Sequence, residues 1–141
     1  MAIEILKNLA HRGGVGSEPD TGDGAGILIQ IPHKFMKKVC DNDSINLPKE
    51  GDYGVGMLFL SPDTDTRMNS LAKLQGIIEE EGMEYLGYRE VPTYSECIGA
   101  SAREAMPHIV QVFIKRPEDV EAGMAFERKL FVSIKAFRKR N

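Results

Sequence analysis

The sequence has no tryptophan, little cysteine and no long hydrophobic run. Its two cysteines, Cys40 and Cys97, lie too far apart for C-x-x-C spacing, so a zinc knuckle or a dithiol redox motif is not expected. We predict two reduced thiols, with a single structural disulfide as the alternative. No run approaches the roughly 20 consecutive apolar residues that span a bilayer, and the start lacks the basic-then-apolar pattern of a signal peptide. A cytoplasmic protein without membrane contact is therefore expected.

Net positive charge is absent as well. The formal net charge is -3 and the isoelectric point is about 5.6, which removes the strongest electrostatic argument for nucleic-acid binding. Hydrophobic residues make up 42% and charged residues 28% of the 141 positions, which is typical of one soluble globular domain. Basic residues crowd the C-terminal end, which we interpret as a solvated surface and not as a binding tail: Lys129, Lys135, Arg138, Lys139 and Arg140.

Apolar spacing and turn residues predict alternating helices and strands. At the start, Ile3, Leu6 and Ala10 recur at helical spacing, and Gly13 with Gly14 would stop that helix. Four strands interleaved with helices imply an α/β or α+β fold around a mixed sheet. The further predicted elements are strands over 27–32, 53–60, 85–91 and 108–116, helices over 33–39 and 117–129, and a connecting loop over 41–52.

The clearest helix pattern lies in the middle of the chain. One of the residues 64–66 would cap this helix, and Gly82 would end it. Its apolar residues fall at three- and four-residue spacing and would form a buried stripe: Met68, Leu71, Leu74 and Ile78. The last stretch, FVSIKAFRKR, fits either a continued helix or a strand.

The segment GGVGSEPDTGDGAG, residues 13–26, is distinctive because it holds six glycines. Gly22, Gly24 and Gly26 give G-x-G-x-G without a following lysine, so a phosphate-cradling nucleotide loop is not expected. The acidic segments DNDSINL and DTDTRMN lack the glycine of a calcium-binding loop, and we interpret them as a loop and a helix cap. The remaining interpretation is a rigid turn that borders a functional cleft together with Arg12, which the spacing alone does not establish.

The histidines and cysteines favour structural roles. His11 fits a helix C-terminus better than a site, and it shares no metal-ligand spacing with His33 or His108. Cys97 has no base that the sequence assigns to it, so we interpret it as a small buried hydrophobe and not as a nucleophile. No metal site is expected.

Three strings, in this order, resemble the class II glutamine amidotransferase domain of the glutamate synthase large subunit: KNLAHRGG, PDTGDGAGILIQIPHKF and FERKLF. The specific part is TGDGAGI followed by an apolar strand and QIP, whereas HRG alone is shared with other class II amidotransferases. GDYGVGMLFL, YREVP and HIVQVFIKRP also stand where that family would have them. The resemblance therefore covers essentially the whole chain.

The resemblance implies part of an N-terminal-nucleophile hydrolase fold over residues 1–141, with a mixed, largely antiparallel sheet and flanking helices. Residues 1–40 would supply the HRG helix, the glycine-rich turn and a strand, and residues 52–141 the supporting strands and helices. The family's complete domain hydrolyses glutamine to glutamate and passes ammonia to a synthase site that forms glutamate from 2-oxoglutarate. The family's FMN, iron-sulfur cluster and NADPH or ferredoxin bind in other regions, so no cofactor is expected in this chain.

By this resemblance Arg12 is the only catalytic-site candidate, because it matches the HRG arginine that helps to position the nucleophile. His11, Gly13 and the turn over 22–26 would be its neighbours. The family's nucleophile is an N-terminal cysteine, whereas this chain begins Met1-Ala2-Ile3. The substrate-gripping arginine, the Asn-Gly pair of the oxyanion hole and the amine-binding aspartate would lie beyond residue 141. We therefore expect the isolated chain to be inactive as a glutaminase.

Three hypotheses follow for the role of the chain. The first is a fragment of a glutamate synthase, either engineered or read from a truncated frame, whose partners would be the remaining segments or subunits of that enzyme and whose family substrate is glutamine. The second is a stand-alone, non-catalytic module that binds glutamine, a subunit or a regulator without turnover. The third is a chain whose missing half-site a partner supplies in trans. An incomplete sheet would also leave an exposed apolar face through which the chain could self-associate.

Overall fold

The computed structural model describes residues 2–8, 26 and 28–140, and the chain forms two compact units. The smaller unit comprises residues 1–30 and 92–106, and the sheet unit comprises residues 31–91 and 107–141. The described elements of the smaller unit are α1 (Ala2–Asn8), the 3-10 helix η2 (Ser95–Cys97) and α4 (Ala100–Glu104). The first of these confirms the helix predicted at the start of the chain.

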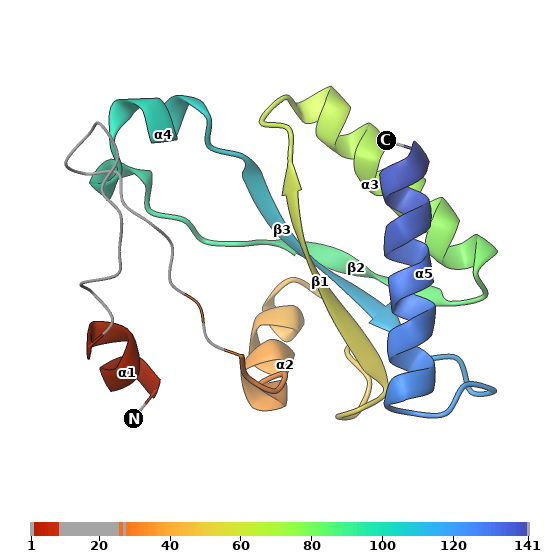
Figure 1. Ribbon diagram of the computed structural model, residues 1–141. Coiled ribbons are helices and arrows are strands. Elements are labelled where there is room, and N and C mark those ends of the chain that lie inside the picture. Colours follow the sequence, from red (N-terminus) through yellow and green to blue (C-terminus); the bar gives the residue numbers. More distant parts are fainter. Residues whose placement is uncertain (1, 9–25, 27, 141) are drawn as a thin grey trace. The chain divides into compact units, whose positions relative to one another are not determined.

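A three-stranded antiparallel sheet lies at the centre of the sheet unit (Figure 1). Its strands β1 (Tyr53–Leu60), β2 (Glu84–Glu90) and β3 (His108–Lys115) stand in the order β1-β3-β2, so β3 is central. Apolar and β-branched side chains dominate β1 and β3, as expected for strands that are covered on both faces. The predicted strands over 53–60, 85–91 and 108–116 are confirmed to within one residue, and so is the α+β fold class.

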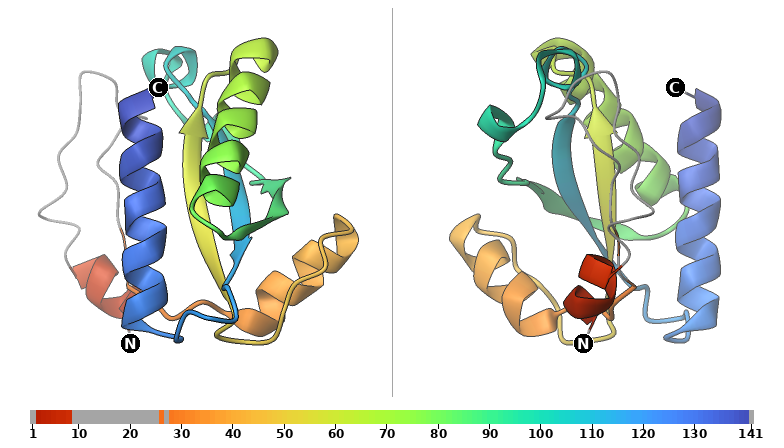
Figure 2. Two further views of the ribbon diagram at one scale, coloured as in Figure 1. Left: turned by 90° about the vertical axis from the view of Figure 1, so that its right-hand side faces the viewer. Right: turned by 60° about the vertical axis from the view of Figure 1, so that its left-hand side comes forward.

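Helices cover both faces of this sheet (Figure 2). α3 (Thr64–Glu80) and α5 (Met124–Arg140) lie on one face, and α2 (His33–Asn42) lies on the other. Beneath α3 and α5 the buried residues are Leu60, Leu71, Leu74, Ile78, Met83, Val110, Val112, Ile114 and Phe126. Beneath α2 they are Met36, Cys40, Ile45, Leu47, Tyr53 and Phe113. Because side chains alternate along a strand, β3 contributes to both clusters.

The ends of α3 show why this helix begins and stops where it does. Asp63 is the N-cap, and its carboxylate accepts a hydrogen bond from the Thr66 amide at 2.9 Å, so the cap predicted within 64–66 was placed too late. At the other end Gly82 takes a φ of +71°, as predicted for a helix stop. The amides of Gly82 and Met83 then bond the carbonyl oxygens of Glu79 and Ile78, which is the Schellman arrangement.

The buried stripe of α3 also differs by one residue from the prediction. Leu71, Leu74 and Ile78 are buried as expected, but Met68 is 48% exposed. Ile77 is buried in its place. The stripe is therefore centred half a turn further along the helix than the apolar spacing indicated.

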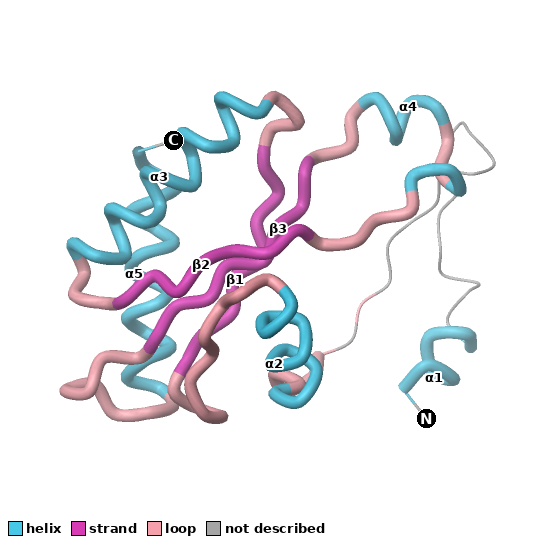
Figure 3. Tube along the Cα trace, turned by 180° about the vertical axis from the view of Figure 1, so that it is seen from behind, coloured by secondary structure: helices cyan, strands magenta, loops and turns pink. Residues whose placement is uncertain are grey.

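The prediction of a buried strand over 27–32 is wrong for the described residues. Residues 28–32 have no regular structure, as the loop that leads into α2 shows in Figure 3, and Leu28 and Ile29 are exposed. A strand is stable only when a neighbour satisfies its backbone groups, and no described strand pairs with this one. The helix predicted over 33–39 is confirmed, and it continues to Asn42, two residues into the expected loop.

The prediction that the last helix begins at residue 117 is also wrong. Residues 117–123 form turns, and α5 starts at Met124 after Gly123, whose φ is +83°. The Arg116 guanidinium donates to the carbonyl oxygens of Pro117 and Val120, so a side chain takes the place of helical amides there. The ambiguous ending FVSIKAFRKR is helical, because it continues α5.

Candidate functional site

The site predicted from the resemblance falls almost entirely outside the described residues. The described residues do not include Arg12, His11 and Gly13, nor residues 22–25 of the glycine-rich turn. Gly26 is described, and it is exposed without regular structure. The role of Arg12 therefore stays a prediction, and the candidate sites on the described residues are two other features of the sheet unit.

The first feature is a polar pair within the sheet. Arg89 on β2 stands directly opposite Gln111 on β3, so both side chains project from the same face, which is the face that carries α2. The Arg89 Nη1 donates to the Gln111 Oε1 at 2.7 Å, and each residue is only 8% exposed. A charged residue in this position is unusual, because arginine is rarely buried without an acidic partner.

Three further polar side chains, those of His33, Tyr53 and Cys40, lie on the α2 side of the sheet. His33 Nδ1 and the Tyr53 hydroxyl form a hydrogen bond of 3.0 Å between the start of α2 and the start of β1. Cys40 on α2 is completely buried, and this burial raises the pKa of its thiol, while the positive charge of Arg89 opposes the rise. Burial likewise raises the pKa of Tyr53. Neither the Cys40 thiol nor the Tyr53 hydroxyl is activated as a nucleophile, since both retain their protons at neutral pH.

The two cysteines are both free thiols, as predicted. Cys97 belongs to η2 in the smaller unit, where it is exposed and its Sγ donates to the Tyr94 carbonyl oxygen at 3.2 Å. Cys97 was expected to be buried, so this part of its interpretation is wrong. The described hydrogen bond of Cys97 joins it to a backbone carbonyl and not to a basic side chain, so this contact does not mark Cys97 as a nucleophile.

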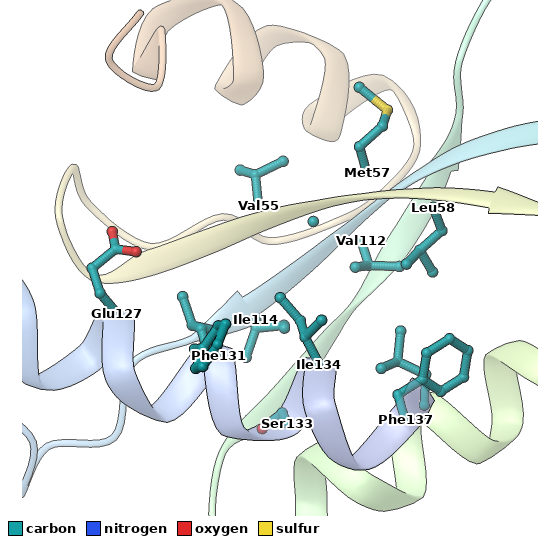
Figure 4. Close-up of a pocket in the computed structure, with 13 residues that line it drawn as sticks. Val55, Met57, Leu58, Val112, Ile114, Glu127, Phe131, Ser133, Ile134 and Phe137 are labelled. Carbon is teal, nitrogen blue, oxygen red and sulfur yellow. The ribbon is translucent and has the colours of Figure 1, made fainter. Parts of the chain in front are cut away.

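The second feature is an apolar groove between β1 and α5, with a volume of about 300 Å³. Glycine makes it possible, because a Cβ on Gly54 would stand 2.6 Å from the Leu130 Cδ1 and one on Gly56 would stand 2.9 Å from the Val112 Cγ2. In Figure 4 Leu58 points from β1 toward α5, and Ile134 points back toward the strands. We call this the β1–α5 groove; its rim residues on α5 are Phe131 and Ile134, which are 57% and 52% exposed.

The remaining charged contacts fasten the ends of the strands. Arg116 and Asp52 form the best ion pair, with Nη2 and Oδ1 at 2.6 Å, and this contact lowers the pKa of Asp52. His108 bonds Glu90 across the sheet, so His108 and His33 have separate partners and are not brought together. Among the described residues, no group of three or more His, Cys, Asp or Glu side chains could hold a metal ion.

Sequence reasoning missed both features. The sequence holds a signal for the polar pair, because Gln111 stands between Val110 and Val112 and Arg89 follows the aromatic Tyr88. The groove had a weaker signal, since α5 carries more apolar residues than one buried stripe needs: Phe126, Leu130, Phe131, Val132, Ile134 and Phe137. Both features favour binding over covalent chemistry.

Comparison with known proteins places these features in context. The family described as glutamine amidotransferases class II matches residues 1–141. The chain is 47% identical over 130 residues to the glutamate synthase [NADPH] large chain of Bacillus subtilis, which covers 92% of this chain and 8% of that protein. It is 33% identical over 132 residues to the ferredoxin-dependent glutamate synthase 2 of Synechocystis, covering 94% and 8%.

A similar match is found with the glutamate synthase [NADH] of Schizosaccharomyces pombe, at 35% identity over 133 residues, covering 91% of this chain and 6% of that protein. The chain thus spans less than a tenth of the length of these relatives. The resemblance indicated by the sequence strings is confirmed. Among the described helices, none has the length and apolar character needed to cross a membrane.

Proposed function

Because this chain belongs to the class II glutamine amidotransferases, we propose that it forms a structural part of the glutaminase domain of a glutamate synthase. In that enzyme the domain hydrolyses glutamine and supplies ammonia for the formation of glutamate from 2-oxoglutarate. The observation that carries the proposal is the match to the family over the whole chain, together with relatives that are all named glutamate synthases.

The described residues support a scaffolding role for the sheet unit. Its polar groups are engaged in fastening the fold: Asp52 with Arg116, and His33 with Tyr53. The Cys40 thiol is completely buried and protonated, so it is not available as a nucleophile. Within this proposal Arg12 is the residue that borders the reaction centre, and the isolated chain does not hydrolyse glutamine. The chain works in the cytoplasm and binds no cofactor itself, and its partners are the other segments or subunits of the enzyme.

The test is a chimera in which this chain replaces the matching stretch of the Bacillus subtilis large chain, the 47% identical relative. We expect glutamate synthesis from glutamine to be retained. In the chimera, Arg12→Ala is expected to lower the rate of glutamate synthesis from glutamine at least tenfold. Synthesis from added ammonia is expected to be preserved, because free ammonia bypasses the glutaminase step. Arg128→Gln, an exposed change on α5, is the matched control.

Two results would speak against this function. A chimera that folds but makes no glutamate from glutamine, with ammonia-dependent synthesis intact, would show that the chain does not belong in a glutaminase domain. An Arg12→Ala variant that loses both activities equally would show that Arg12 supports the fold and does not border the reaction centre.

We also propose that the β1–α5 groove receives another segment of the larger polypeptide, which corresponds to the exposed apolar face expected from the sequence. The groove has an apolar floor, its rim residues Phe131 and Ile134 are half-exposed, and the relatives have more than ten times the length of this chain. Without that segment, the isolated chain is expected to associate with itself through the groove.

Sedimentation velocity over a range of concentrations tests this second proposal. The wild-type chain is expected to show concentration-dependent association, and Phe131→Lys or Ile134→Lys is expected to abolish it. Met124→Lys is the matched control, because Met124 is 68% exposed on the same helix but does not line the groove. A wild-type chain that stays monomeric at all concentrations, or association that survives both substitutions, would refute the docking role.

A further inference from the structure

The Arg89 side chain is a buried cation whose partner is neutral. Arg89 is 8% exposed, and its one side-chain hydrogen bond to a described residue runs from Nη1 to the amide oxygen of Gln111 at 2.7 Å. No carboxylate among the described residues forms an ion pair with it, whereas Arg116, a comparably placed arginine at the end of β3, pairs with Asp52. A buried charge without a counter-ion is destabilising, because desolvation is not offset by an opposite charge.

The other donors of this guanidinium are available. Arginine has five N–H donors, of which one is used here. Among the described residues, no buried side-chain nitrogen or oxygen lacks a partner. Nε and Nη2 of Arg89, which bond no described group, therefore reach solvent. A fork of donors that is held in place by Gln111 and open on its far side is suited to an incoming carboxylate, which it can bind through two parallel hydrogen bonds.

The neighbouring side chains on the same face are apolar. Gln111 pairs with Arg89 on one side and with Met57 on the other, so these three side chains form one row across the sheet. The adjacent row holds Ile109 opposite Phe59, which is 66% exposed. The cation therefore stands at one end of a row whose far end, and whose neighbouring row, are apolar, a pattern that fits an anionic head joined to a short hydrocarbon stem.

We propose that Arg89 and Gln111 form a binding site for a small aliphatic carboxylate. The guanidinium binds the carboxylate, Gln111 fixes the guanidinium by accepting from Nη1, and the apolar side chains of Met57, Phe59 and Ile109 contact the aliphatic stem. This site uses none of the residues assigned to glutamine hydrolysis above. It therefore stands or falls independently of the proposed function.

The experiment follows the side-chain Nε–H signals of arginine in the full chain by NMR during titration with hexanoate. We expect one signal, missing in Arg89→Gln, to shift saturably with a dissociation constant on the order of 1 mM, which small ligands of this size reach. Acetate lacks the stem and hexanamide lacks the charge, so each is expected to bind at least tenfold more weakly. Arg89→Gln is expected to lose binding at least tenfold, and Arg89→Lys to lose part of it.

A second variant keeps the proposal testable where Arg89→Gln does not fold. Gln111→Glu places a carboxylate opposite Arg89, so this variant is expected to melt at a higher temperature than the wild type and to bind no hexanoate. Arg128→Gln removes the same charge from an exposed position on α5 and is expected to bind as the wild type does. Absence of a saturable shift in the wild type, or equal binding by hexanamide or by Gln111→Glu, would overturn the proposal.

Discussion

Replacing Gly82 by alanine is expected to destabilise the fold, whereas the same change at Gly76 is expected to stabilise it. A Cβ at either position would meet nothing within 4 Å, so neither change creates a clash. Gly82 has a φ of +71°, where an alanine is strained by about 1–2 kcal/mol. Gly76 lies inside α3, where alanine is favoured over glycine by roughly 0.5–1 kcal/mol. The two variants should therefore differ by about 2 kcal/mol.

Urea unfolding followed by far-UV circular dichroism measures both free energies of unfolding. At roughly 3 °C per kcal/mol for a chain of this size, the melting temperatures should differ by about 6 °C. Gly82→Asn is a useful third variant, since asparagine tolerates a positive φ and should fall between alanine and glycine. If Gly82→Ala were as stable as the wild type, or if Gly76→Ala were the less stable of the pair, the account of how α3 ends would be wrong.

Three other predictions concern the core, the thiols and an ion pair. Phe113 is completely buried on the α2 face, so Phe113→Ala should lower the free energy of unfolding by about 3–5 kcal/mol in the same urea assay. Under native conditions a thiol reagent should label Cys97 and leave Cys40 unmodified until urea unfolds the chain; rapid labelling of both would contradict the packing of α2. The contact with Arg116 lowers the pKa of Asp52 from its usual 3.8, so the pair stabilises the fold above that pH and its contribution is lost as the pH falls through the lowered value. The melting temperature should accordingly fall more steeply below about pH 4 in the wild type than in Asp52→Asn.

Local patterns were sufficient to predict most elements of the sheet unit. The runs over 53–60 and 108–115 combine apolar density with flanking turn residues, and no competing signal lies inside them. The last helix was misplaced because Pro117 and its acidic neighbours resemble a helix start. What prevents a helix there is the Arg116 side chain, which bonds the carbonyl oxygens of the turn, and this contact depends on tertiary structure.

The candidate site was harder to predict, for a reason that lies in the strand register. Arg89 and Gln111 were visible as polar residues within strands, but their pairing depends on the bulge between Tyr85 and Gly87. Without that bulge β2 would shift by one residue and present Arg89 on the opposite face of the sheet. The bulge forms at Gly87, whose φ of +138° disfavours other residues. No periodicity in the sequence reveals such a shift, so the polar pair required a structure.

The residues that stabilise the sheet unit and the residues proposed to bind ligands lie in different parts of that unit. β3 is central and supplies completely buried side chains to both clusters, with Val110 on one face and Phe113 on the other. A change in either cluster therefore weakens the same strand. The residues offered for binding lie instead at the edges of the clusters: Arg89 on the edge strand β2 and Phe131 on α5. Because the sheet lies between these two residues, each can be altered without disturbing the other, and effects on ligand binding can be told apart from effects on docking.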